Sequence, residues 1–93
     1  MFSWDTRKAL SNLKKHGVSF EEAATVFGDA EALDWDDPEH SLQEHRFKRL
    51  GASLAGRIVI VVYAPRRSKD GKEIIRIISA RQATRKEREA YAG

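Results

Sequence analysis

The first half of the chain has the hydrophobic spacing of helices. Ala9, Leu10 and Leu13 mark one face of a helix over residues 6–15, and residues 20–27 carry apolar side chains at i, i+3, i+4 and i+7. A carboxylate or hydroxyl residue suited to an N-cap precedes each segment, and a glycine follows the first. This half therefore predicts two consecutive helices.

The second half changes to the patterns of strands. Residues 44–50, 57–64 and 73–80 read as extended segments separated by turns with glycine or proline, which is typical of an antiparallel meander. The middle segment is largely apolar and β-branched, so we expect it to be the most completely covered strand. A short strand at residues 2–4 precedes the helices, and a capping pattern at residues 84–87 starts a last helix.

These elements predict an α+β fold in the order β-α-α-β-β-β-α, with an antiparallel sheet and helices packed mainly on one face. The acidic connection before the meander also allows an additional strand at residues 32–35. Because the chain contains no repeats, low-complexity tracts or linkers, we expect residues 1–93 to form a single domain. The face of the sheet away from the helices is expected to stay open.

Basic residues on two of the predicted strands are expected to meet on this open face. Strand alternation puts Arg46 and Lys48 on one face and Phe47 on the other, and it groups Arg76 with Ala80. An arginine buried among isoleucines costs several kcal/mol unless it is paired. We therefore expect Arg46, Lys48 and Arg76 to converge on an exposed surface that binds anions.

The charge of the chain is strongly asymmetric. Residues 1–45 hold four lysines and arginines against ten acids, a net charge of −6, whereas residues 46–93 hold thirteen against four, a net charge of +9. Such asymmetry is typical of a surface that faces a polyanion, although solvated surface charges would give the same composition.

The composition disfavours several classes of function. The 93 residues include no cysteine, which excludes disulfides, thiolate metal sites and thiol nucleophiles. No apolar run reaches the about 18 residues that a membrane span needs, and the N-terminus lacks the pattern of a signal peptide. We therefore expect a soluble cytoplasmic protein with no membrane partner.

Metal-free cleavage of RNA is one chemistry that these residues could support. It needs a group that takes the 2′-hydroxyl proton, cations that stabilise the phosphorane, and a group that protonates the leaving oxygen. Arginine suits the middle role because its planar fork holds two phosphate oxygens, and Arg46 and Arg76 are the candidates. The candidates for the proton transfers are Lys8, His40, Glu44, His45 and Tyr91.

Each of these candidates also has a structural explanation. A salt bridge from Arg76 to Glu44 or Glu73 would account for an arginine in an apolar strand as well as catalysis would. Lys8 reads equally as a solvated residue of the first helical turn, and Tyr91 as a helix residue that covers the core.

Arginines near the C-terminus form a second candidate surface. Arg81, Arg85 and Arg88 are spaced four and three residues apart, as on one side of a helix, and with Lys48 they are candidate RNA-binding residues. A charged helix face is often only solvated, so the stripe by itself is a weak signal.

A metal site is a minor alternative. Acids and a histidine gather between Asp34 and His40, but their spacing lacks the glycine and the twelfth-position glutamate of an EF-hand. The sequence contains no glycine-rich phosphate loop, nucleophile elbow or HExxH pattern. We expect neither a metal nor a cofactor.

Three stretches carry a resemblance over nearly the full chain: FSWDTRKALSNLKKHGVSFEEAATVF, DDPEHSLQEHRF and RIISARQATRKEREAY. In their order and spacing they resemble the BrnT family of bacterial type II toxins. The resemblance implies a RelE-like fold and a ribonuclease that arrests translation by cutting RNA. Among the positions that match the family pattern, those suited to a chemical role are Lys8, Glu44, Arg46 and Arg76. The main departure is PRRSKDGKE, a longer and more basic turn, which bears on how the substrate is placed.

The resemblance also implies a partner. A BrnA-type antitoxin with a ribbon-helix-helix part would neutralise the toxin, and operator DNA would be contacted only through that antitoxin. The ribosome is a further candidate, because some RelE-like toxins cleave only ribosome-bound message. Two interpretations from other classes stay open, namely a basic module that binds nucleic acid without chemistry and a module that docks on another protein.

Overall fold

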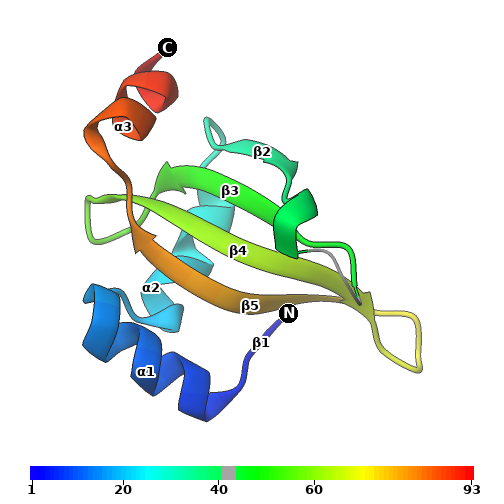
Figure 1. Cartoon of the computed structure of the whole chain (residues 1–93). Coiled ribbons are helices and arrows are strands. Elements are labelled where there is room, and N and C mark those ends of the chain that lie inside the picture. The colour runs from blue at the N-terminus through cyan, green and yellow to red at the C-terminus, as the bar shows by residue number, and fades with distance from the viewer. Residues whose placement is uncertain (41–43) are drawn as a thin grey trace.

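The computed structural model describes residues 1–40 and 44–93, which form a five-stranded sheet and three α-helices (Figure 1). The strands are β1 (Phe2–Ser3), β2 (Leu33–Asp36), β3 (Phe47–Ala52), β4 (Ile58–Arg67) and β5 (Glu73–Gln82). The helices are α1 (Thr6–His16), α2 (Phe20–Thr25) and α3 (Arg85–Ala92), and two 3-10 turns are η1 (Val26–Gly28) and η2 (Pro38–His40). The expected α+β class is confirmed.

The strands lie in the order β1-β5-β4-β3-β2, and β2 to β5 pair antiparallel as the meander predicts. The additional strand that the acidic connection allowed at residues 32–35 is present as β2, which adds a fourth strand after the helices to the order β-α-α-β-β-β-α. The sheet is not wholly antiparallel, because β1 pairs with β5 in parallel. All four residues of β2 are exposed, so no buried alternating face marked this strand in the sequence.

Each α-helix begins at the N-cap residue that its pattern predicts. The side chains of Asp5, Ser19 and Thr84 each accept a hydrogen bond from the backbone N–H three residues further on. The Glu87 carboxylate accepts in turn from the Thr84 N–H, which completes a capping box. Gly17 ends α1 with a φ of 70°, in the left-handed region that glycine adopts most easily. None of the described helices has the length and apolar character to span a membrane.

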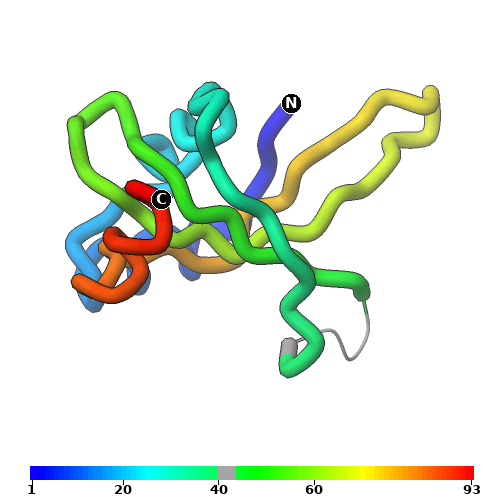
Figure 2. Tube along the Cα trace, turned by 90° about the horizontal axis from the view of Figure 1, so that it is seen from above, coloured from blue at the N-terminus to red at the C-terminus, as the bar shows by residue number. Residues whose placement is uncertain are grey.

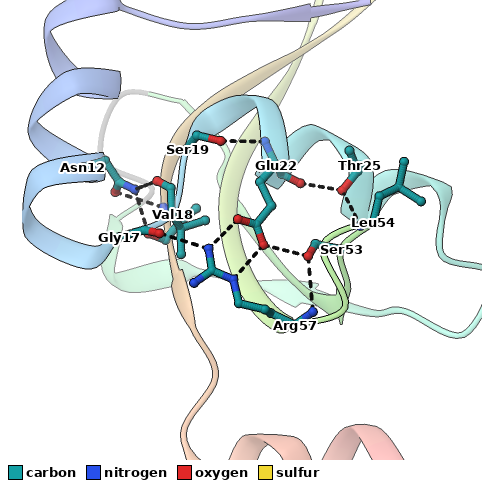
Figure 3. A network of polar contacts seen from close by, with 10 residues as sticks. Asn12, Gly17, Val18, Ser19, Glu22, Thr25, Ser53, Leu54 and Arg57 are labelled. Carbon is teal, nitrogen blue, oxygen red and sulfur yellow. Dashed lines mark hydrogen bonds and ion pairs between the residues drawn. The ribbon is translucent and has the colours of Figure 1, made fainter.

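The apolar face expected on α1 is wrong for its two leucines, although Ala9 packs against the core. Leu10 and Leu13 are 65% and 46% exposed, whereas Asn12 is buried. The Asn12 Nδ2 donates to the carbonyl oxygens of Ala80 at 2.8 Å and Val18 at 2.9 Å, and its Oδ1 accepts from the Ala80 N–H at 3.1 Å (Figure 3). The helix therefore docks on the edge of β5 through an amide that replaces a neighbouring strand, not through its leucines.

The core lies between the sheet and the segment that includes α2 and η1, which Figure 2 shows on one side of the strands. Gly51 of β3 lies directly under this segment, because a Cβ at Gly51 would come within 2.9 Å of the Ala32 Cβ. The buried residues of this core are Val18, Phe20, Ala23, Val26, Val59, Val61, Ile77 and Ala80.

A polar network fixes α2 to the turn between β3 and β4 (Figure 3). The Glu22 carboxylate accepts hydrogen bonds from the Arg57 Nε at 3.0 Å and the Ser53 hydroxyl at 2.7 Å, and an Arg57 Nη2 donates to the Gly17 carbonyl oxygen at 2.9 Å. The hydrogen bond from Arg57 holds the pKa of Glu22 below its ordinary value, against the opposing effect of burial. The network anchors the two consecutive helices to one end of the sheet.

No described α-helix covers the middle of the opposite face, called here the open face (Figures 1 and 2). Figure 1 shows α3 at one end of the sheet and the β4–β5 hairpin projecting at the other end. Tyr91 of α3 packs against the buried pair Leu50 and Ile60, which are paired in register on β3 and β4. The open face is therefore closed at one end by α3 and left without an α-helix over its middle.

Candidate nucleic-acid interface

Three arginines converge on one carboxylate at the open face. The Arg76 Nη2 lies 3.4 Å from the Glu44 Oε1, and the Arg46 Nη2 lies 3.6 Å from the same oxygen. The Arg66 Nη2 lies 3.0 Å from the Glu44 Oε2. The side chains of Glu44, Arg46 and Arg76 are 21%, 25% and 23% exposed, whereas that of Arg66 is 53% exposed. We call Arg46, Arg66 and Arg76 the arginine cluster.

Glu44 is ionised at the centre of the arginine cluster. Burial raises the pKa of Glu44, but a hydrogen bond from Arg66 and the charges of the three arginines outweigh burial and bring the pKa below its ordinary value. Glu44 is therefore a carboxylate at neutral pH, and three guanidinium groups share it. A guanidinium has five N–H donors, so a partly buried group of three suits an anion that accepts several hydrogen bonds, as a phosphate does.

Arg76 meets both expectations for an arginine in an apolar strand, namely an ion pair with a glutamate and a place on the open face. The ion pair with Glu44 that was the structural alternative is present. Arg46 and Arg76 also converge on the open side of the sheet, as strand alternation predicts. The pairing explains how an arginine is tolerated there, and it leaves a role in anion binding open.

Lys48 lies on the open face with Arg46 and Arg76. Ala80 was expected on the same face as Arg76, and this prediction is wrong. Lys48 pairs in register with Val62, and Val62 with Ser79. A register shift follows, so that Ile78 is an additional residue on β5, and Ala80 turns into the core with 1% exposure. Strict alternation cannot anticipate such a bulge, which reverses the faces of the residues on either side of it. Ser79 therefore takes the place on the open face.

The expected stripe of Arg81, Arg85 and Arg88 is not one side of a helix, because α3 begins only at Arg85 and Arg81 belongs to β5. The Arg81 guanidinium donates two hydrogen bonds to the Glu87 carboxylate, at 2.7 and 2.9 Å. Arg85 is 88% exposed and forms an i,i+4 pair with Glu89, and Arg88 donates to a backbone carbonyl oxygen. Of the three arginines, Arg81 is the one placed on the sheet.

Glu44 is the candidate for proton transfer that contacts the arginine cluster. Lys8 lies on α1, where it lines a small cavity beside β5. Tyr91 donates its hydroxyl proton to Asp29 at 2.7 Å and so helps to hold α3 against the sheet. The side chain of His40 lies outside the described part of the structure.

The acidic connection has structural partners. Asp34 accepts a hydrogen bond from the Tyr63 hydroxyl at 2.7 Å and another from the Arg49 guanidinium at 2.6 Å, which ties β2 to β3 and β4. Asp36 lies 3.2 Å from the Nε2 of His45, whose ring stacks on a neighbouring phenylalanine. Within residues 1–40 and 44–93, no group of three or more histidine, aspartate or glutamate side chains is placed to hold a metal ion.

Arg66 is a member of the cluster that the sequence reading missed. Val62, Ala64 and Arg66 are every second residue of β4 and so lie on one face of the strand, and Ala64 pairs in register with Arg76. The period of two therefore carried a signal for Arg66. Its place in a basic turn sequence made it resemble an ordinary solvated charge.

The sheet, its helices and the arginine cluster define a small α+β protein with three arginines gathered on one face of its sheet. The chain belongs to the BrnT family, because residues 4–87 match the model described as "Ribonuclease toxin, BrnT, of type II toxin-antitoxin system". A toxin of this kind has an RNA substrate and an antitoxin partner.

One solved structure shows a similar fold. The crystal structure of the Brucella abortus ribonuclease toxin, BrnT, matches with a TM-score of 0.67 and 24% sequence identity, over 91% of this chain and 99% of that chain. No curated protein matches the sequence.

Proposed function

We propose that the protein cleaves RNA without a metal ion at the open face, where Arg46 and Arg76 stabilise the phosphorane. The observation that carries this proposal is the convergence of the arginine cluster on Glu44, on a face whose middle no described α-helix covers. A guanidinium stays protonated at any working pH, and its fork can bind two phosphate oxygens. Donors held in place before the substrate arrives need little reorganisation in the transition state.

In the proposed reaction, the 2′-oxygen of one ribose attacks the adjacent phosphorus, and the bond from that phosphorus to the 5′-oxygen of the next nucleotide breaks. The Glu44 carboxylate takes the proton of the 2′-hydroxyl as the new bond forms. The leaving 5′-oxygen gains a proton, for which Lys8 remains the candidate from the sequence. The products are a 2′,3′-cyclic phosphate end and a 5′-hydroxyl end.

Substrate binding would make Glu44 a stronger base. In the free protein the arginines hold the pKa of Glu44 low, and a carboxylate with a low pKa accepts a proton poorly. A phosphate that draws Arg46 and Arg76 toward its own oxygens removes part of this effect. The pKa of Glu44 then rises toward its ordinary value when the 2′-hydroxyl is in place.

Lys48 extends the positive surface of the open face, and we assign it to RNA binding. Contacts from Arg81, Arg85 and Arg88 to RNA remain predictions. Arg81 is already neutralised by a carboxylate, and the other two arginines lie on α3.

The cellular role follows from the family. Cleavage of cytoplasmic RNA would arrest translation, with the ribosome as a further candidate partner. A BrnA-type ribbon-helix-helix antitoxin would neutralise the toxin, and the complex would contact operator DNA through the antitoxin. Expression of this chain with and without the neighbouring open reading frame tests the role. We expect growth arrest that co-expression relieves, and a chain that never slows growth contradicts the proposal.

Purified variants test the site. Arg46→Ala and Arg76→Ala are each expected to lower single-turnover cleavage of RNA about a hundredfold or more in the presence of EDTA. Lys14→Ala removes one positive charge from the exposed side of α1 and is the matched control, which should cut at the wild-type rate. An arginine variant that stays folded and cuts as fast as wild type removes that residue from the site. RNA binding by a wild-type protein that cleaves nothing favours a non-catalytic binding module.

A further inference from the structure

A groove runs between α1 and the open face. It consists of two cavities of about 260 and 220 Å³ that share His16 and Ser79. Each cavity is smaller than the about 300–1,000 Å³ of a typical small-molecule site, so an extended chain that passes through both fits better than a compact ligand. The lining includes Lys8, Lys15 and His16 from α1, Lys48 from β3, and Ile60 and Val62 from β4.

The groove exists because α1 takes the place of a strand beside β5. The strand β1 pairs with β5 only at Ile75 and Arg76. Further along β5, the Asn12 side chain hydrogen-bonds to the N–H and the carbonyl oxygen of Ala80 (Figure 3). Positions 8, 15 and 16 lie three or four residues from Asn12 and share its side of the helix. The docking of α1 therefore turns two lysines and a histidine toward the sheet.

The bulge in β5 completes the floor of the groove. Because Ile78 is an additional residue, Ser79 lies in the row that joins Lys48 to Val62 across the open face. This row ends at the cavities beside α1, since Ser79 lines both of them. A hydroxyl, an aliphatic surface and a lysine thus follow one another over three adjacent strands.

The lysines of the groove have no acidic partner within residues 1–40 and 44–93. Among the described residues, no aspartate or glutamate lines either cavity. The same part of the chain contains no ion pair to Lys8, Lys15 or Lys48, whereas Arg81 at the rim is bound by Glu87. Three ammonium groups around an aliphatic floor suit a ligand with repeated negative charges and flat or apolar units between them, which is the chemistry of a nucleotide chain.

We infer that this groove binds the single RNA strand next to the phosphate that the arginine cluster holds. Lys15 and Lys48 contact backbone phosphates, and Val62 supports a sugar or base. Val62 lies two residues along β4 from Ala64, which pairs with Arg76. At about 3.4 Å per residue this separation is about 7 Å, comparable with the spacing of successive phosphates in an extended strand. The inference rests on the proposed function, since it assumes that RNA occupies the arginine cluster.

Binding of an RNA whose 2′-hydroxyls are all methylated, and which therefore cannot be cleaved, tests the groove by fluorescence anisotropy over a series of salt concentrations. The double variant Lys15→Ala/Lys48→Ala should lose about tenfold in affinity. Its slope of log K against log salt should fall by about 1.4, because each phosphate contact on a single strand contributes about 0.7. Lys14→Ala is the control on the same helix, and Lys15→Arg/Lys48→Arg, which keeps both charges, should retain most of the affinity.

The outcomes separate this inference from the proposed function. A double alanine variant that is folded and binds RNA with the affinity and salt slope of Lys14→Ala overturns the groove, even if wild-type protein cleaves RNA. A wild-type protein that neither binds the methylated RNA nor cleaves ordinary RNA overturns both. Loss of affinity in the alanine variant, with recovery in the arginine variant, supports the groove independently of the cleavage rate.

Discussion

Replacement of Glu44 by glutamine removes the negative charge at the centre of the arginine cluster while nearly keeping the shape of the side chain. Three guanidinium groups then face a neutral amide. Two properties should change together, because Glu44 has both a structural and a chemical role in the proposed site. The first is the stability of the fold, and the second is the rate of RNA cleavage.

The loss of stability can be bounded from the exposure of the groups. Glu44, Arg46 and Arg76 are 21–25% exposed. Their pairing lies between exposed ion pairs, worth about 0–1 kcal/mol, and buried pairs, whose disruption costs about 3–5 kcal/mol. Solvent screens the pair to Arg66, which is 53% exposed. We expect Glu44→Gln to lower the free energy of unfolding by about 2 kcal/mol at pH 7.

The pH dependence of this loss follows from the direction of the pKa shift. The pKa of Glu44 is lower in the folded protein than in the unfolded chain, so its stabilising effect is present above the unfolded pKa and is lost as pH falls through the folded pKa. Urea unfolding from pH 7 down to about pH 3 should show the two proteins converging in acid. An equal gap at both ends, or no gap at pH 7, refutes the ion pairing.

The same variant tests the chemistry. As the general base, Glu44 contributes about 10²–10⁴-fold, so Glu44→Gln should lower cleavage by that factor. Methylated RNA should bind at least as tightly as before, because a competing negative charge has left the cluster. A folded Glu44→Gln protein that cuts at the wild-type rate shows that Glu44 is not the base.

Three further substitutions test how the fold holds this face open. Gly51→Ala places a Cβ within 2.9 Å of the Ala32 Cβ and should cost about 1–3 kcal/mol in urea unfolding. Asn12→Ala leaves buried backbone groups of β5 without partners and should cost about 2–4 kcal/mol by the same assay, whereas an undiminished midpoint would contradict the docking of α1. The hydrogen bond from Arg81 lowers the pKa of Glu87 to about 2. Glu87→Gln should therefore reduce the free energy of unfolding, measured by thermal unfolding, by about 1–2 kcal/mol at pH 7. The difference between the two proteins should vanish as the pH is lowered toward about 2.

The patterns of residue spacing predict the elements of this fold better than their arrangement. Caps, apolar periods and turn residues located every α-helix and four of the five strands within a few residues, and the acidic connection allowed the fifth. The parallel pairing of β1 with β5 could not be predicted from the sequence, because tertiary packing determines which strand a two-residue strand pairs with. The same holds for α1, where hydrophobic spacing pointed to Leu10 and Leu13 while the buried contact belongs to Asn12.

The candidate site was accessible from the sequence only in part. A period of two put Arg46 and Lys48 on one face of their strand. The expectation that the most apolar side of the sheet faces the helices brought Arg76 to the same face. The bulge at Ile78 has no signature in an apolar run, so the exchange of Ala80 for Ser79 on the open face could not be predicted. The groove beside α1 was equally hidden, since it depends on how a helix docks on a strand edge.

The central claim is that Arg46 and Arg76 hold the phosphate at which RNA is cut. The most direct measurement follows the side-chain Nε–H resonances of these arginines by NMR while methylated RNA is added to saturation. We expect both resonances to shift in step with binding, while that of Arg57, in the network behind the sheet, stays in place. Saturation of the protein with RNA while both resonances keep their free positions would contradict the account.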